Sequence, residues 1–297
     1  MNARFNLPEF YDGRNIYTEC LDIIKRYPEV VFPNTEISSI FGIFPGSIWN
    51  GGGNTPCNTV HRDIIKDTIE YYNFELNMPL RFTFTNPLIT EPQCFDTYSN
   101  IIAELGNNGR NEILVSNPIL EKYLRDNYKK YKYCRSIIAA KDEPYAFYGA
   151  YGLYTLSVIR RDRNNQWDYL DTIPMEDRAK IEFLCNDPCP DNCPRLYTHY
   201  LDHARNQLAC AASNDTDKCT SFNVTGPFQL HNMKTNNHTY ISRELIDNEY
   251  LPRGFCEFKC SGRFSVVLIV QNLLNYIFKP EYRDDMFLKL FRADGLI

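Results

Sequence analysis

The stretch "LRFTFTNPLITEPQCFDTYSNIIAELGNNGRNEILVSNPILEKYLRDNYKKYKYCRSIIAA", residues 80 to 140, shows the pattern that predicts the fold. It contains three short runs rich in β-branched and aromatic residues, at 80–86, 111–117 and 134–140. Between these runs lie two segments with apolar residues at helical spacing, at 95–106 and 119–130. Strands that alternate with helices in this way indicate βα units and a parallel sheet.

The same alternation extends along the chain of 297 residues. Further strand-like runs lie at 38–44, 153–161, 180–186, 238–242 and 255–261, which brings the total to eight. Eight strands close a barrel of the TIM type, whose usual length is about 250 residues. We therefore predict an α/β fold, a single TIM-like (β/α)8 barrel that forms one domain over residues 1–297.

Two segments do not fit a regular barrel repeat. Residues 209–237 form a long polar stretch, which we interpret as an insertion loop before the seventh strand. The segment "RDDMFLKLF", residues 283–291, follows the eighth strand-like run and its helix, and predicts an extra C-terminal helix packed outside the barrel. No linker rich in Pro, Gly or Ser divides the chain, which agrees with one domain.

The composition narrows the class of protein. Apolar residues make up 43% of the chain, which is ample for a buried core, and the net charge of -5 gives no general attraction to nucleic acid or anionic membranes. The N-terminus does not resemble a signal peptide, and the apolar runs fall short of a membrane span. We expect a cytoplasmic protein with no membrane partner, whose Asn, Tyr and Ile bias suggests a bacterial or phage genome.

In a parallel barrel the chemistry lies where the strands end, because the loops that follow them meet at one mouth. Polar side chains follow several of the predicted strands. Arg161 and Arg163 follow the fifth run, Asp187 follows the sixth, and Gly262 with Arg263 follows the eighth. The arginines are candidates for holding an anionic group, and the backbone around Gly262 for binding an anion.

The stretch "FLCNDPCPDNCPRLYTHY", residues 183–200, places three cysteines at this mouth. Cys185, Cys189 and Cys193 have a spacing of four, and thiolates so close together can bind an iron–sulfur cluster or a zinc ion. Cys94 is the preferred fourth ligand because it also follows a strand, with Cys219 and Cys260 as alternatives. His199 or His203 could instead complete a zinc site. A redox disulfide, or a chance cluster in a chain with 11 cysteines, is the competing interpretation.

Two fragments resemble a known family. "CPDNCPR", residues 189–195, resembles the C-x-x-x-C-R element of the collagenase-like bacterial peptidases, and residues 241–263 are similar to their segment that ends in K-I-E-G-R. The family includes proteins of oxygen-independent ubiquinone hydroxylation and of RNA hydroxylation. The resemblance covers roughly residues 80–263, and two departures are Pro194 before Arg195 and "CSGR" in place of "IEGR".

The resemblance implies a TIM-like barrel and, in the hydroxylation branch, a 4Fe-4S cluster held by four cysteines. Cys189 and Cys193 correspond to ligands by motif position, and Cys185 is the third candidate. Lys259 matches the second motif, as do Gly262 and Arg263. Fold transfers across such a distance more readily than activity does.

Three functional hypotheses follow. The first is a cluster-binding barrel of the hydroxylation type that acts on RNA or on a small aromatic or anionic substrate. The second is a collagenase-like peptidase, for which the H-E-x-x-H and G-x-S-x-G motifs are absent. The third is a non-catalytic barrel, with zinc or no metal, that acts as a protein partner or homo-oligomer. The catalytic candidates are Asp187, Arg195, His199 and Lys259.

Overall fold

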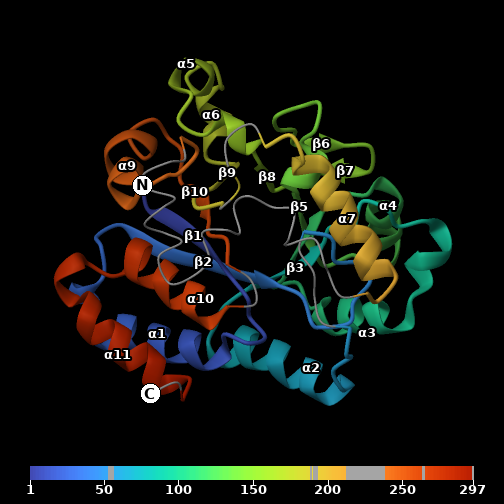
Figure 1. Cartoon of the computed structure of the whole chain (residues 1–297), viewed down its shortest axis with the longest axis horizontal. Helices are drawn as coiled ribbons and strands as arrows, with labels where there is room; N and C mark the ends of the chain where they lie inside the picture. The colour runs from blue at the N-terminus through green and yellow to red at the C-terminus, as the bar shows by residue number, and fades with distance from the viewer. Residues whose placement is uncertain (53–56, 188, 190–192, 212–237, 263–264, 296–297) are drawn as a thin grey trace.

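A closed barrel of eight parallel strands forms the centre of the computed structural model, which describes residues 1–52, 57–187, 189, 193–211, 238–262 and 265–295. The strands follow one another around the barrel in the order β1-β10-β9-β8-β5-β4-β3-β2 (Figure 1). Their bounds are β1 Ala3–Pro8, β2 Thr35–Gly42, β3 Leu80–Phe84, β4 Glu112–Val115, β5 Lys132–Arg135, β8 Leu156–Val158, β9 Ile181–Leu184 and β10 Glu257–Lys259. The predicted TIM-like α/β barrel is confirmed.

Helices surround the strands (Figure 1). They are α1 Arg14–Arg26, α2 Arg62–Glu70, α3 Thr97–Gly106, α4 Pro118–Asn127, α5 Trp167–Leu170, α6 Met175–Arg178, α7 Leu196–Leu208, α9 Arg243–Leu245, α10 Val266–Asn272 and α11 Arg283–Ala293. Short π-helical turns extend three of them: η2 Tyr71–Glu75 after α2, η8 Ile246–Tyr250 after α9 and η9 Leu273–Ile277 after α10. Helix α11 packs beside α1 outside the barrel, as expected for the extra C-terminal helix (Figure 1).

Side-chain caps mark where some helices begin. Asp96 accepts a hydrogen bond from the backbone N–H of Ser99 at the start of α3, at 2.8 Å. Asn117 does the same for Leu120 at the start of α4, at 2.9 Å, and its amide also donates to the carbonyls of Pro87 and Ile89. Such caps satisfy backbone donors that have no partner within the helix. Asn117 therefore both begins α4 and positions the loop after β3.

The identity of two strands differs from the prediction. The run at 238–242 is not a strand; Ile241 donates one backbone hydrogen bond to Cys185 at 2.9 Å, and its carbonyl accepts from the Tyr276 hydroxyl at 2.9 Å. The eighth strand is β1, Ala3–Pro8, which pairs with both β2 and β10. Its polar residues Arg4 and Asn6 lie on the inner face of the barrel, where Arg4 contacts Glu257 and Asn6 donates to Glu182. The predicted insertion at 209–237 therefore precedes the eighth barrel strand and not the seventh, and residues 212–237 lie outside the described part.

The connection between β5 and β8 contains no regular crossover helix. It holds a 3-10 turn, η4 Ile137–Ala139, and an antiparallel hairpin of β6 Tyr148–Gly149 and β7 Gly152–Leu153. The barrel still closes here because β5 pairs with β8 through two residues of each strand.

The interior of the barrel is charged. Arg81 of β3 is fully buried and donates to Glu182 of β9 at 2.5 Å and to Glu112 of β4 at 2.8 Å. Strands β3 and β9 are not neighbours, so the contact between Arg81 and Glu182 crosses the inside of the barrel. Asn6 of β1 also donates to Glu182, at 2.6 Å. Buried charges are tolerated when each has such partners.

The outward faces of the strands carry the apolar core. Phe5, Phe82, Phe183 and Phe258 are fully buried and belong to one continuous hydrophobic cluster. These side chains alternate along the strands with the inward charges, as the two-residue period of a strand requires. None of the helices in the described ranges combines the length and apolar character needed to cross a bilayer.

Candidate functional site

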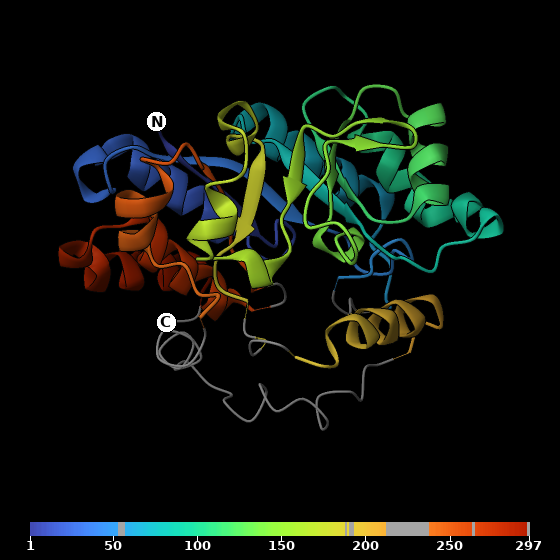
Figure 2. The same ribbon diagram turned by 90° about the horizontal axis from the view of Figure 1, so that it is seen from above.

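Helix α7 lies at the end of the barrel where the carboxyl ends of the strands form the mouth (Figure 2). Asn86, just after β3, donates from its amide to the carbonyl of Ala204 in α7 at 3.2 Å. Tyr197, in the first turn of α7, donates to the carbonyl of Ala140 after β5 at 3.4 Å. Helix α7 therefore contacts the loops that follow β3 and β5. This end is where a parallel barrel places its chemistry.

An arginine and a carboxylate meet between two neighbouring strand ends. Arg161 begins the 3-10 turn η5 (Arg161–Arg163) after β8, and Asp187 lies in the loop after β9. Their Nη1 and Oδ2 atoms are 3.5 Å apart, with the two side chains 3% and 10% exposed. Burial would lower the pKa of Arg161, but Asp187 and then Cys189 raise it, so the guanidinium stays charged.

Two of the predicted cysteine ligands lie beside this pair. Arg161 donates to the carbonyl of Cys189 at 3.1 Å, and the backbone N–H of Cys189 donates to Asp187 at 2.9 Å. Cys193 lies close enough to influence both Arg161 and Cys189 electrostatically. Burial, followed by Asp187, raises the pKa of the Cys189 thiol, so this group keeps its proton at neutral pH.

The other two predicted ligands lie elsewhere. Cys185 is fully buried beside Cys260, which is also buried and follows the adjacent strand. Both thiols lie near Tyr276 of the outer helical layer. Because Glu182 points inward, the two-residue period places Cys185 on the outer side of the barrel wall. Cys94 is buried in η3 (Glu91–Phe95), where its thiol lies 3.7 Å from the carbonyl of Thr90.

The described residues therefore do not complete the expected four-thiolate site. Within the ranges that the structure describes, no three His, Cys, Asp or Glu side chains are grouped closely enough to hold a metal ion. Cys219, the alternative fourth ligand, lies outside these ranges. Only Cys189 and Cys193 of the four predicted ligands lie near each other.

Helix α7 carries two further candidates. Arg195 is the residue before its first turn, and its Nη2 lies 3.8 Å from Asp202. His199 stacks on His203 one turn later, with 4.2 Å between the ring centroids. This i, i+4 pairing is the ordinary neighbour spacing of a helix surface. His203, which was considered above for a zinc site, therefore lies beside His199. Within the described residues, the two histidines are not grouped with a third side chain that could bind the metal.

Lys259 lies inside the barrel at the end of β10. Its Nζ is 3.9 Å from the centroid of the Phe41 ring on β2. Strands β10 and β2 are separated by β1, so this cation–π contact also crosses the interior. The second-motif lysine therefore projects into the barrel and does not lie on its surface.

The remaining candidates serve the loops at the mouth. Arg163 donates to Gln166 at 2.9 Å and covers the ring of Tyr169 at 4.5 Å, away from the Arg161 pair. Gly262 has a φ of 124°, which favours glycine, and Arg263 lies outside the described residues.

A closed set of hydrogen bonds joins the loop after β9 to the loop after β10, which contains Gly262. Asn186 accepts from the N–H of Ser261 at 2.6 Å and donates to Asn272 at 2.7 Å, and Asn272 donates to the carbonyl of Ser261 at 2.7 Å. These bonds tie the loops after β9 and β10 to α10. Asn186 therefore has a structural role at the mouth.

The charged interior is the part of the molecule that sequence reasoning missed. Arg81, Glu182 and Glu257 each stand between apolar residues in a predicted strand. A parallel sheet is covered on both faces, so a charge at such a position must lie inside the barrel. A single charged residue within an apolar strand run was therefore the sequence signal that could have predicted the charged interior.

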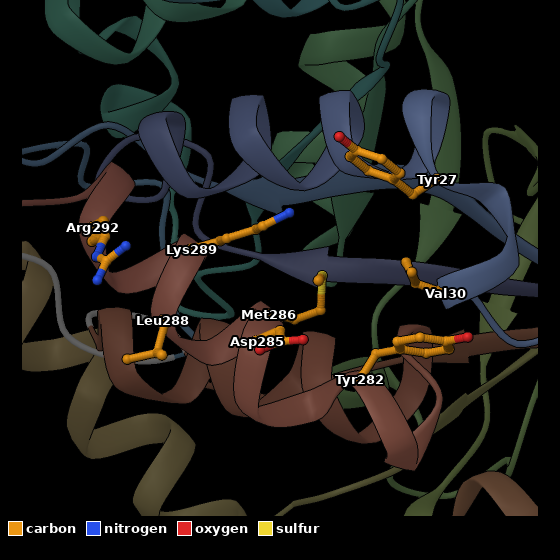
Figure 3. A pocket seen from close by; sticks show the side chains of 8 residues that line it. All are labelled: Tyr27, Val30, Tyr282, Asp285, Met286, Leu288, Lys289 and Arg292. Atoms are coloured by element: carbon orange, nitrogen blue, oxygen red, sulfur yellow. The ribbon is translucent and has the colours of Figure 1, made fainter.

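A groove of about 310 Å³ lies between the end of α1 and helix α11 (Figure 3). Tyr27 and Val30, which precede β2, line one side, and Met286 and Lys289 of α11 line the other. Because Tyr27 and Val30 precede the start of β2, the groove is away from the mouth. Its lining mixes apolar and charged groups without a candidate catalytic pair.

Comparisons with known proteins support the architecture. No protein-family profile matches the sequence, and no curated protein matches it significantly. A solved structure described as the U32 peptidase Mk0906 matches with a TM-score of 0.52 and 12% identity, over 88% of this chain and 93% of that one. The likeness is one of fold. It agrees with the remote resemblance to collagenase-like peptidases that the two sequence fragments suggested.

Proposed function

We propose that this chain is an enzyme of the collagenase-like peptidase type, with its active site at the barrel mouth. The observation that carries the proposal is the buried pair of Arg161 and Asp187 at two neighbouring strand ends. The fold likeness to a U32 peptidase agrees with it. A peptide bound under α7 would present its carbonyl to this pair.

The pair has the groups that hydrolysis needs. The Asp187 carboxylate takes a proton from water as the water oxygen attacks the peptide carbonyl. The Arg161 guanidinium stabilises the negative charge that develops on the carbonyl oxygen. The proton then passes from Asp187 to the leaving amine, which restores the carboxylate. Cys189 is a poor alternative nucleophile because its thiol remains protonated.

The test is cleavage of gelatin and of a mixed peptide library. We expect Asp187→Asn to lower kcat/KM by about 10²–10⁴-fold, the usual contribution of a general base. The matched control is Asp162→Asn, because Asp162 lies nearby but pairs with Arg160 at 2.6 Å. Full activity in Asp187→Asn, or no cleavage by the wild-type protein with and without divalent metals, would refute the proposal.

A second candidate function is supported by the proximity of Cys189 and Cys193 to Arg161. We propose that these two thiolates take part in binding an iron–sulfur cluster, as in the hydroxylation branch, whose substrate would be RNA or a small aromatic or anionic compound. Cys189 and Cys193 would supply two of the ligands, and the proposal needs further ligands besides these two.

Anaerobic purification with analysis of iron and acid-labile sulfide separates these functions. Cluster binding predicts iron and sulfide in the purified protein, and their loss in Cys189→Ser and Cys193→Ser. Cys185→Ser is the control, because Cys185 lies on the outer side of the wall. Stoichiometric zinc without sulfide, with a melting temperature lowered by a chelator, would instead support a zinc-binding interaction protein. A protein without iron, sulfide or zinc would exclude both metal-binding candidates.

A further inference from the structure

Two cysteines outside the predicted metal site lie together at the edge of the mouth. Cys57 belongs to the connection between β2 and α2, and Cys210 follows the end of α7. Burial, followed by a side-chain interaction with Cys210, raises the pKa of the Cys57 thiol, so the two thiols lie next to each other. Cys57 is partly exposed and Cys210 is exposed, so both sulfurs are accessible to small molecules.

The backbone at Cys210 has an unusual conformation for a cysteine. Its φ is 48°, and the N–H groups of Cys210 and Ala211 donate to the carbonyls of Gln207 at 3.3 Å and Asn206 at 2.9 Å. This is the Schellman arrangement that ends a helix, in which glycine usually occupies the left-handed position. A cysteine here carries backbone strain, and strain of this kind concentrates at functional positions.

The helix that ends at this cysteine lies across the mouth. Asn86 donates to the carbonyl of Ala204 in α7 at 3.2 Å and also to the carbonyl of Ile48 at 2.9 Å. Ile48 belongs to the same connection as Cys57, so one side chain already joins that connection to α7. A covalent bond between Cys57 and Cys210 would strengthen a contact that exists without it.

We propose that Cys57 and Cys210 form a reversible disulfide that fastens α7 over the barrel mouth. The oxidant is a small-molecule disulfide of the glutathione type. The Cys210 thiolate attacks one of its sulfurs, forms a mixed disulfide and releases one small thiol. The Cys57 thiolate then attacks the Cys210 sulfur and releases the second thiol. The two cysteines lose two protons and two electrons, and the oxidant gains both.

The test exposes the whole protein to oxidised glutathione and counts free thiols after denaturation. We expect two of the 11 thiols to disappear and to return with dithiothreitol. Peptide mapping without reduction should show the Cys57 peptide joined to the Cys210 peptide. Hydrogen exchange across residues 196–210 should slow in the oxidised protein. Activity is not needed for any of these measurements.

Matched variants make the result specific. Cys57→Ser and Cys210→Ser should each abolish the cross-link and the slower exchange, whereas Cys256→Ser should keep both. An unchanged thiol count would overturn the proposal, as would glutathione attached to either cysteine without a link between them. If a variant fails to fold, the peptide map of the wild-type protein decides alone.

Discussion

Arg81 shows what a single residue contributes to this barrel. It lies fully inside, and its guanidinium contacts Glu112 and Glu182 from two different strands. A buried ion pair adds little relative to apolar packing, but removal of one partner leaves the other charged and without compensation. Arg81 is therefore needed to compensate the buried charges of Glu112 and Glu182, even though burying its own charge costs free energy.

We expect Arg81→Met to lower the free energy of unfolding by about 3–5 kcal/mol, because Glu182 would lose its cationic partner in the interior. Urea denaturation measures the change. The control is Arg14→Met, because Arg14 pairs with Asp67 on the surface with exposed fractions of 34% and 66%. That variant should lose less than about 1 kcal/mol. Equal losses in the two variants would contradict this account.

Glu257 predicts a dependence of stability on pH. Burial raises its pKa from 4.5 to about 7, against the lowering effect of Arg4, while Glu182 also raises it. Between pH 4.5 and 7 the folded state holds a proton that the unfolded state has lost. Stability therefore falls as pH rises through this range, by roughly 2–3 kcal/mol.

We expect Glu257→Gln to remove most of this fall when urea denaturation is repeated from pH 5 to pH 8. The control is Glu36→Gln, because Glu36 contacts the same Arg4 at 3.5 Å but is 45% exposed. A pH dependence that survives in Glu257→Gln and disappears in Glu36→Gln would contradict this prediction, because it would show that Glu36 causes the loss of stability.

At the scale of elements, the position of α7 depends on its C-terminal turn and on its contacts with two loops. Its last turn closes in a Schellman arrangement with Cys210 at a φ of 48°. Its sides contact the loops after β3 and β5 through Asn86 and Tyr197. The helix is therefore held by a few polar contacts and not by a large apolar face.

We expect Cys210→Gly to raise the free energy of unfolding by about 1 kcal/mol under reducing conditions, since glycine adopts the left-handed conformation without strain. Cys210→Ser keeps a side chain there and should change stability little. Thermal and urea denaturation measure both variants. A gain in the serine variant that equals the gain in the glycine variant would show that the thiol, and not the backbone, causes the strain.

At the scale of the whole molecule, the alternation of strands and helices predicted the barrel, because the pattern repeats and one wrong strand does not change the fold class. The run at 238–242 misled because its β-branched and aromatic residues pack beside the end of β9 without pairing further. The strand Ala3–Pro8 was missed because its inward residues are polar, and only the closed barrel gives them partners.

The candidate site was predictable as a place but not as an arrangement. Arg161, Asp187, Cys189 and Cys193 follow strands, so their position at the mouth could be expected. The spacing of the cysteines could not show that Cys185 turns outward, because that depends on which side of the wall the strand presents at that residue. The pairing of Cys57 with Cys210 joins distant segments and had no local signal.

Deletion of residues 1–8 tests the importance of closure. We expect this variant to lose cooperative unfolding, because β2 and β10 would become edges and Asn6 and Arg4 would no longer contact Glu182 and Glu257. Near-ultraviolet circular dichroism and the sharpness of the urea transition measure the loss. Deletion of Met1 and Asn2 alone should leave both unchanged. A cooperative transition in the longer deletion would show that the remaining strands suffice.

The pairing of β1 with β10 also sets the order of events during synthesis. Arg4 contacts Glu257, which is 253 residues later, so the first strand cannot find its second neighbour until most of the chain has left the ribosome. Until then the nascent sheet keeps two unpaired edges, and Arg4 lacks its contact with Glu257. A cell that makes this protein must keep an incomplete barrel from associating with its neighbours until β10 has been synthesised.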